Sequence, residues 1–202
     1  MNKLNKKIKM NGGMSYIELI VVLSIFATIS SIMMFNYGDF QAKVDIKNLA
    51  SDIALKIVEA QKLSLSGLLP PVGFSTIPNW KPSYGVYFNL TSPYDNKSFI
   101  YFVDLDNLKD YTGGSTCTGE CLSKITITKN NSISEIKVFY KDASSAVLND
   151  LTITFSRPDS GAILFSNSAQ LSNVSYVQIT IVSPKGAIAK IKLYPSGRVQ
   201  IN

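Results

Sequence analysis

The fold is decided first by an apolar stretch at residues 14–40, MSYIELIVVLSIFATISSIMMFNYGDF. No charged side chain occurs between Glu18 and Asp39, a run of twenty residues. A helix rises ~1.5 Å per residue, so a run of this length spans ~30 Å, the thickness of the hydrocarbon core of a bilayer. We therefore predict a single membrane-spanning helix with residues 17–37 inside the membrane.

The residues before this stretch are basic. Residues 1–13 contain four lysines and no acid, whereas the segment that follows the apolar run is electrically balanced. By the positive-inside rule the N-terminus lies in the cytoplasm, and the C-terminal part lies outside the inner (cytoplasmic) membrane, in the periplasm or the extracellular space. An ordinary secretory signal peptide is the alternative, but the run is longer than a usual signal core and an acid stands at its start.

Glu18 is unusual because it lies at the edge of the apolar run. An ionised carboxylate in this position is unfavourable by about 1–3 kcal/mol, and such groups normally have a partner. The stretch GGMSYIELIVVLSIFA at residues 12–27 resembles the leader junction and first helical turns of the type IV pilins and of the pseudopilins of type II secretion. The basic leader, Gly13, Glu18 and the uninterrupted apolar run together carry this resemblance.

The resemblance implies a route of processing and assembly. A prepilin peptidase would cut the leader 1–13 after Gly13 and methylate the new amino terminus at Met14, so that Glu18 becomes the fifth mature residue. In a fibre of other pilins or pseudopilins, the Glu18 carboxylate would pair with the free amine of a neighbouring Met14. An assembly platform with a separate cytoplasmic ATPase would drive this step. A stray acid at the membrane interface is the alternative interpretation of Glu18.

Helical periodicity continues beyond the membrane segment. Apolar residues recur at three- and four-residue steps over 46–63. A helix is expected to end at Gly67, which is followed by Pro70 and Pro71. One helix over 14–67 is therefore predicted, and its apolar stripe is expected to dock on the following domain rather than form a free coiled coil.

From about residue 80 the pattern becomes that of β-strands. Aromatic, nearly continuous apolar runs at 84–88 and 98–103 suit strands that are buried on both faces. Further strands are predicted where apolar and polar residues alternate, at 125–128 and 151–155, at 177–181, and in a closing hairpin at 187–201. About seven to nine strands predict a compact antiparallel sheet or sandwich over 68–202, and hence an α+β fold with a long N-terminal helix packed on a C-terminal β-domain. The segments YGVYF, FVDLDN and PSGRVQI resemble the GspH/FimT-like minor pilins, one branch of the superfamily.

The composition argues against an enzyme. The chain has no histidine, which excludes Ser-His-Asp, Cys-His and HExxH sites because each needs an imidazole. The sequence also contains no Gly-rich phosphate loop, paired-carboxylate motif or evident cluster of metal ligands. We therefore predict a structural protein without a catalytic residue, a cofactor or a metal.

The predicted β-domain contains a pair of cysteines and a group of three aspartates that could form a disulfide or a metal site. Cys117 and Cys121 enclose three residues and are predicted to form a small disulfide outside the cytoplasm, with two reduced thiols as the alternative. Asp104, Asp106 and Asp110 do not fit the spacing of an EF-hand calcium loop. An acidic turn that closes a hairpin is the preferred interpretation of these three residues.

The bases near the C-terminus are candidate DNA contacts. FimT-like pilins of competence systems bind DNA through a terminal G-R-x-R motif, and this chain has Gly197 and Arg198 but carries Gln200 in place of the second arginine. Lys190, Lys192 and Arg198 would give few phosphate contacts, and a solvated strand is the preferred interpretation. The predicted function is a minor pilin or pseudopilin of a type II secretion pseudopilus or type IV pilus, with DNA uptake as the alternative.

Overall fold

The computed structural model describes residues 14–74, 81–91 and 94–202. The chain divides into two compact units, the first ending at Phe40 and the second running from Gln41 to Asn202. A single helix, α1 (Tyr16–Ser66), contributes residues to both units. The predicted leader, with the cleavage residue Gly13, lies outside the described residues.

Helix α1 begins with a capping sequence. The Ser15 carbonyl accepts hydrogen bonds from the backbone N–H groups of Glu18 at 3.0 Å and Leu19 at 3.1 Å. Serine just before a helix with glutamate three residues later is the capping-box pattern, and an acid in the first turn interacts favourably with the positive end of the helix dipole. Glu18 therefore favours the start of the helix whether or not it has a partner elsewhere.

The end of α1 is a Schellman motif. Gly67 has φ 62°, its N–H donates to the Ser64 carbonyl at 3.1 Å, and the Leu68 N–H donates to the Leu63 carbonyl at 3.4 Å. Only glycine adopts this left-handed conformation without steric cost, and these two bonds satisfy carbonyls that have no partner within the helix. The helix end predicted at Gly67 is confirmed.

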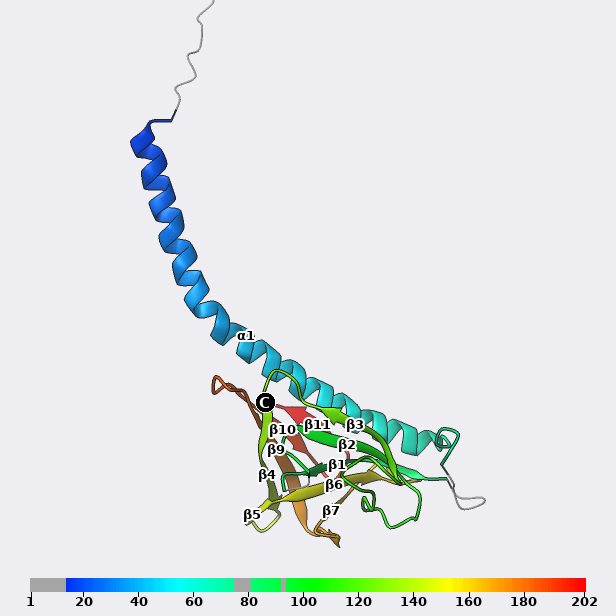
Figure 1. Ribbon diagram of the computed structural model, residues 1–202. Coiled ribbons are helices and arrows are strands. Elements are labelled where there is room, and N and C mark those ends of the chain that lie inside the picture. The colour runs from blue at the N-terminus through cyan, green and yellow to red at the C-terminus, as the bar shows by residue number, and fades with distance from the viewer. Residues whose placement is uncertain (1–13, 75–80, 92–93) are drawn as a thin grey trace, which may run out of the picture. The chain divides into compact units, whose positions relative to one another are not determined.

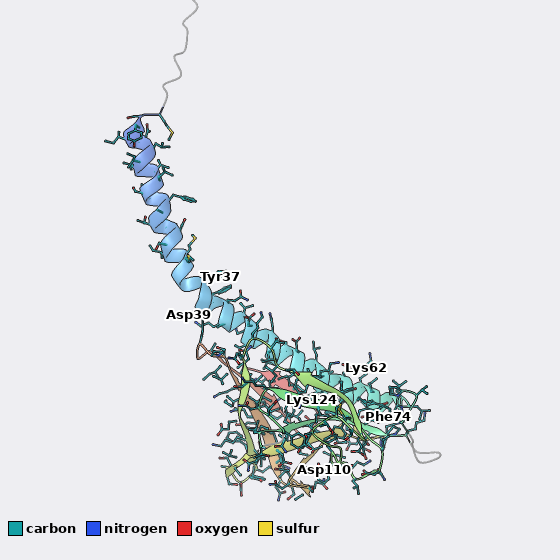
Figure 2. The ribbon with its side chains drawn as sticks, viewed as in Figure 1. Tyr37, Asp39, Lys62, Phe74, Asp110 and Lys124 are labelled. Carbon is teal, nitrogen blue, oxygen red and sulfur yellow. A yellow bond between two sulfur atoms is a disulfide. The ribbon has the colours of Figure 1, made fainter. Side chains whose placement is uncertain are left out.

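The second half of α1 forms one wall of the core of the unit Gln41–Asn202 (Figure 1). Its buried residues lie on one stripe: Ile46, Ala50, Ile53, Ile57 and Ala60, none more than 1% exposed. The opposite face of the helix carries exposed residues such as Lys62 (Figure 2). The prediction that this stripe docks on the β-domain is confirmed.

Polar contacts fix the position of this helical segment on the domain. Near its end, the Tyr84 N–H donates to Ser64 Oγ at 2.8 Å, and the Tyr84 hydroxyl donates to the Leu68 carbonyl at 3.0 Å. Near Gln41, Lys129 Nζ lies 2.7 Å from Asp45 Oδ1. The helix is thus held at both ends of its buried stripe.

Within the described residues the β-domain has two antiparallel sheets (Figure 1). The six-stranded sheet has the order β3 (Cys121–Thr126), β2 (Ser98–Asp104), β1 (Ser83–Asn89), β6 (Asp150–Phe155), β7 (Ala162–Ser166) and β8 (Ala169–Gln170). The five-stranded sheet has the order β11 (Val199–Ile201), β10 (Ile188–Leu193), β9 (Val174–Val182), β4 (Ser132–Tyr140) and β5 (Ser145–Leu148). The predicted α+β fold is confirmed.

The two sheets and α1 enclose one hydrophobic core. Its members alternate along the strands, with Val86 and Phe88 on β1, Ile153 on β6 and Ile179 on β9 all at most 1% exposed. The described strands outnumber the prediction because β4, β5, β7 and β8 were not foreseen. In β4 the pairing with β9 shifts between Ile133 and Glu135, and such a bulge interrupts the alternation by which a strand is recognised.

The far face of the six-stranded sheet is covered by the connection between β2 and β3, residues 105–120. A second cluster lies under this connection: Tyr87, Ile100, Phe102, Tyr111 and Cys121, with Tyr94 and Cys117 packed against it. This cover explains why β1 and β2 are buried on both faces, as their continuous apolar runs predicted. Because β2 and β3 pair antiparallel, the predicted acidic residues do lie in the connection that closes a hairpin, and this connection spans residues 105–120.

The same connection buries two threonines of β6. These threonines alternate with apolar residues along the strand, and Thr152 and Thr154 are both 0% exposed. Thr152 Oγ1 donates to Asp110 Oδ1 at 2.5 Å, and Thr154 Oγ1 donates to the Lys109 carbonyl at 2.7 Å. Asp110 therefore lies on the side of the sheet away from α1 (Figure 2).

Ile53 and Leu55 provide a matched test of the helix–domain packing. Ile53 is 0% exposed and Leu55 is 64% exposed on the same helix. Ile53→Ala is expected to lower the free energy of unfolding by about 2–5 kcal/mol, because it removes buried methyl groups and leaves a cavity. Leu55→Ala is expected to stay within about 0.5 kcal/mol of the original protein. Denaturant unfolding of the full chain in detergent, followed by circular dichroism, measures both; equal losses would contradict the docking arrangement.

Candidate functional site

The first half of α1 bears a continuous exposed apolar surface. Every residue from 14 to 34 is exposed, with Ile17 at 70%, Phe26 at 69% and Met34 at 83%. Its most apolar part has a mean hydropathy of 2.2 and none of it is buried. By length and composition α1 can cross a membrane, as an N-terminal signal sequence also could.

Two hydroxyl side chains inside this segment donate hydrogen bonds to carbonyls of the helix itself. Ser24 Oγ donates to the Val21 carbonyl and Thr28 Oγ1 donates to the Ile25 carbonyl, each at 2.8 Å. In hydrocarbon an unpaired hydroxyl would be costly, and these bonds reduce that cost. The two hydroxyls are therefore compatible with a lipid environment.

Glu18 differs from these hydroxyls because its charge has no partner in the chain as described. Its residue is exposed, and the ion pairs among described residues do not include its carboxylate. Met14, the other predicted assembly residue, is 65% exposed. The charge of an anion at the edge of an apolar surface can be compensated by a cation from another molecule. A free amino terminus is such a cation.

The C-terminal bases lie on the outer face of the five-stranded sheet. Lys192 Nζ is 5.0 Å from the ring centroid of Tyr176, and the Arg198 guanidinium is 4.1 Å from that of Tyr194. Lys190 lies two residues from Lys192 on the same face of β10, opposite Thr180. The structure thus brings the three predicted candidates to one surface.

This surface contains aromatic rings that the sequence reasoning missed. The rings of Phe139 and Tyr176 stack with centroids 4.5 Å apart and planes at 19°, and Tyr194 lies 5.8 Å from Tyr176. Lys137 Nζ lies 5.5 Å from the Phe139 centroid. We call these residues the aromatic–cationic face: Lys137, Phe139, Tyr176, Lys192, Tyr194 and Arg198. In the sequence, Lys137 is two residues from Phe139 and Lys192 is two residues from Tyr194. The pairing of β4 with β9 and of β9 with β10 brings these two pairs together with Tyr176.

The cysteines form the predicted disulfide. Cys117 and Cys121 are joined with their Cα atoms 4.9 Å apart. Two tyrosine hydroxyls donate hydrogen bonds to backbone carbonyls of the same connection. Tyr111, within the connection, donates to the Gly114 carbonyl at 2.8 Å, and Tyr94 donates to the Gly113 carbonyl at 3.2 Å. The disulfide therefore closes a turn in the cover over the six-stranded sheet.

The predicted acidic turn separates into two environments. Asp110 is buried against Thr152, whereas Asp104 and Asp106 lie close together and are joined by Glu120. Sequence reasoning missed Glu120 because it is distant along the chain. Its proximity could only follow from the pairing of β2 with β3.

Comparison with known proteins gives no assignment. No protein-family model, curated protein or solved structure matches this chain. A functional proposal therefore rests on the fold, on the apolar segment with Glu18, and on the aromatic–cationic face.

Removal of the disulfide is expected to destabilise the protein modestly. Closure of so short a loop restricts the unfolded chain by about 2 kcal/mol. A Cys117→Ala, Cys121→Ala double variant should therefore lose about 4–8 °C in its thermal midpoint. Thermal unfolding of the full chain measures this loss, and intact mass after alkylation, with and without reductant, reports the bond itself. Alkylation of both cysteines without reductant would contradict the disulfide.

Proposed function

We propose that this protein is a minor pilin or pseudopilin. It is processed after Gly13 by a prepilin peptidase, held in the cytoplasmic membrane by residues 17–37, and assembled through α1 into a pseudopilus or type IV pilus. The globular domain then stands on the outer side of the membrane. The chain acts structurally, and a separate ATPase supplies the work of assembly.

The exposed apolar segment with a single carboxylate at its start carries this proposal. A surface of this kind suits lipid before assembly and the packed helices of a fibre afterwards. A signal peptide would be removed as a unit, whereas α1 continues without interruption from the apolar segment into the buried stripe Ile46–Ala60. A continuous helix that ends in a docked domain supports a retained anchor rather than a disposable one.

Pairing between Glu18 and a neighbouring Met14 amine explains why an acid is tolerated there. In a fibre the two charges would leave water together, and an unpaired carboxylate in that setting would oppose association. The pair also sets an axial register, because a shift of one helix along another separates the charges. The capping contribution of Glu18 to its own helix is independent of this role.

Replacement of Glu18 tests the assembly role. Glu18→Gln should leave membrane insertion and leader removal intact but reduce incorporation into fibres at least about tenfold, since the amine partner loses its counter-charge. Asp39→Asn, at the other end of the apolar run, is the matched control and should assemble normally. The readout is the amount of protein in sheared fibres relative to membranes, in cells that carry the peptidase and platform.

The control also shows which result would contradict the role of Glu18. Normal incorporation of Glu18→Gln, or an equal loss with Asp39→Asn, would be evidence against it. The mass of the mature N-terminal peptide tests the class of protein separately. A methylated Met14 terminus supports a pilin, and an uncut leader argues against one.

The aromatic–cationic face supports a second candidate function, DNA binding for uptake. Three cations lie over three aromatic rings on one sheet face, and such a surface can neutralise phosphates and stack unpaired bases. The net charge of +6 includes four leader lysines, so the mature chain carries about +2. Any such interaction is therefore weak and sensitive to salt.

Salt-dependent binding distinguishes this second function. The full chain in detergent is titrated with single-stranded DNA between about 50 and 200 mM salt, and the expected logarithmic slope is about −2 to −3. Arg198→Ala and Lys192→Ala should each weaken binding and reduce the slope by about one. Lys124→Ala, on β3 of the other sheet (Figure 2), is the control and should have no effect. No binding at the lowest salt, or an equal effect of the control, would exclude this face as a DNA site.

A further inference from the structure

Three carboxylates converge where β2 ends. Asp104, Asp106 and Glu120 each offer an oxygen atom, and these atoms lie within 4.8 Å of one another. Asp104 is the last residue of β2, and Glu120 immediately precedes β3. The Val103 N–H donates to the Glu120 carbonyl at 3.0 Å, so the pairing of the two strands places Glu120 beside the end of β2.

Asp104 has little compensation for its charge. It is 0% exposed, and neither of its carboxylate oxygens has a hydrogen-bond partner. Lys109 Nζ lies 3.5 Å from Asp104 Oδ2, but it also donates to Ser83 Oγ at 3.1 Å and to Asn107 Oδ1 at 2.5 Å. The ammonium near Asp104 is thus shared with two other acceptors, and a buried carboxylate without hydrogen bonds is costly.

The acid–base properties of Asp104 agree with this geometry. The pKa of its carboxyl is raised to about 6, chiefly by burial and also by the charges of Glu120 and Asp106, while the Lys109 ammonium lowers it. The backbone of Asn107 lowers the pKa as well. A positive ion among the carboxylates would favour the ionised form, because it supplies the charge that Lys109 alone does not.

The other two carboxylates are held in place by the connection between the strands. Glu120 accepts the Leu105 N–H at 2.9 Å on Oε1 and the Thr112 N–H at 3.0 Å on Oε2. Asp106 accepts the Leu108 N–H at 3.0 Å on Oδ1 and the Thr112 hydroxyl at 3.1 Å on Oδ2. Each carboxylate oxygen has a second lone pair, so these bonds orient the groups and leave capacity for an ion.

We propose that Asp104, Asp106 and Glu120 bind one Ca²⁺ ion. Carboxylate oxygens are the ligands that Ca²⁺ prefers, and two ligands at about 2.4 Å from one ion are at most about 4.8 Å apart. Mg²⁺ requires distances of about 2.0–2.1 Å and would need tighter convergence. The ion enters past Asp106, which is exposed, and water completes its coordination. Lys109 moves away from Asp104 as the ion binds. This site is independent of the proposed assembly through α1.

Direct titration of the metal tests the site. The full chain in detergent, freed of metal with EDTA, is titrated with CaCl₂ by calorimetry, and one ion per chain is expected with a dissociation constant of about 0.1–1 mM. The thermal midpoint should rise with Ca²⁺ concentration, because the ion binds the folded state. Affinity should fall as the pH is lowered, since protons compete with the ion for the three carboxylates. MgCl₂ should bind more weakly.

Two variants distinguish specific Ca²⁺ binding at this site from nonspecific binding to surface carboxylates. Asp106→Asn should weaken Ca²⁺ binding about tenfold or more, whereas Asp142→Asn should not. The two residues are matched, because each is exposed and accepts a backbone N–H two residues ahead at 3.0 Å. Lys109→Gln should lower the thermal midpoint in EDTA, and Ca²⁺ should restore it and bind more tightly than to the original chain.

Two results would overturn the proposal. One is the lack of saturable binding by the original chain up to about 10 mM CaCl₂. This concentration is well above the dissociation constants of extracellular calcium modules, which are about 0.1–1 mM. The other is an equal loss of affinity in Asp106→Asn and Asp142→Asn. If Asp106→Asn does not fold, the titrations of the original chain and of Lys109→Gln still decide between the outcomes.

Discussion

Burial of the α1 stripe against the two sheets is the interaction on which the folded unit depends. Ile46, Ala50, Ile53, Ile57 and Ala60 close the core that the inner faces of the sheets leave open. The Schellman end at Gly67 and the bonds between Ser64 and Tyr84 fix where the helix stops on the domain. Because the stripe shares one continuous helix with the apolar segment, a single element belongs both to the folded core and to the stretch that is long and apolar enough to cross a membrane.

The connection over residues 105–120 is the second organising feature. It covers a sheet face that would otherwise be exposed, buries Thr152 and Thr154, and brings Glu120 to Asp104. The disulfide and two tyrosine hydroxyls hold it in place. The carboxylates of Asp104 and Glu120 are thereby buried away from water. The connection therefore contains buried negative charge in addition to packing against the sheet.

The outer faces of the two sheets, which point away from the core, differ in what covers them. The six-stranded sheet is closed by its own connection, whereas the five-stranded sheet presents the aromatic–cationic face. Cations stacked over aromatic rings keep those rings half-covered and keep the positive charge accessible. The proposed DNA contact and the proposed calcium site therefore lie on different sheets of the domain.

Sequence alone determined the helix, its apolar segment, its end at Gly67 and the α+β class, because these features depend on local periodicity and on glycine geometry. It also predicted the disulfide from two nearby cysteines, and most of the strands that alternate regularly. Only the tertiary structure decided which residues share a face or a cluster. Strand pairing joined Tyr176 to Phe139 and Tyr194, and it brought Glu120 to Asp104. Contacts of this kind depend on register between distant segments, which the period of one segment does not specify.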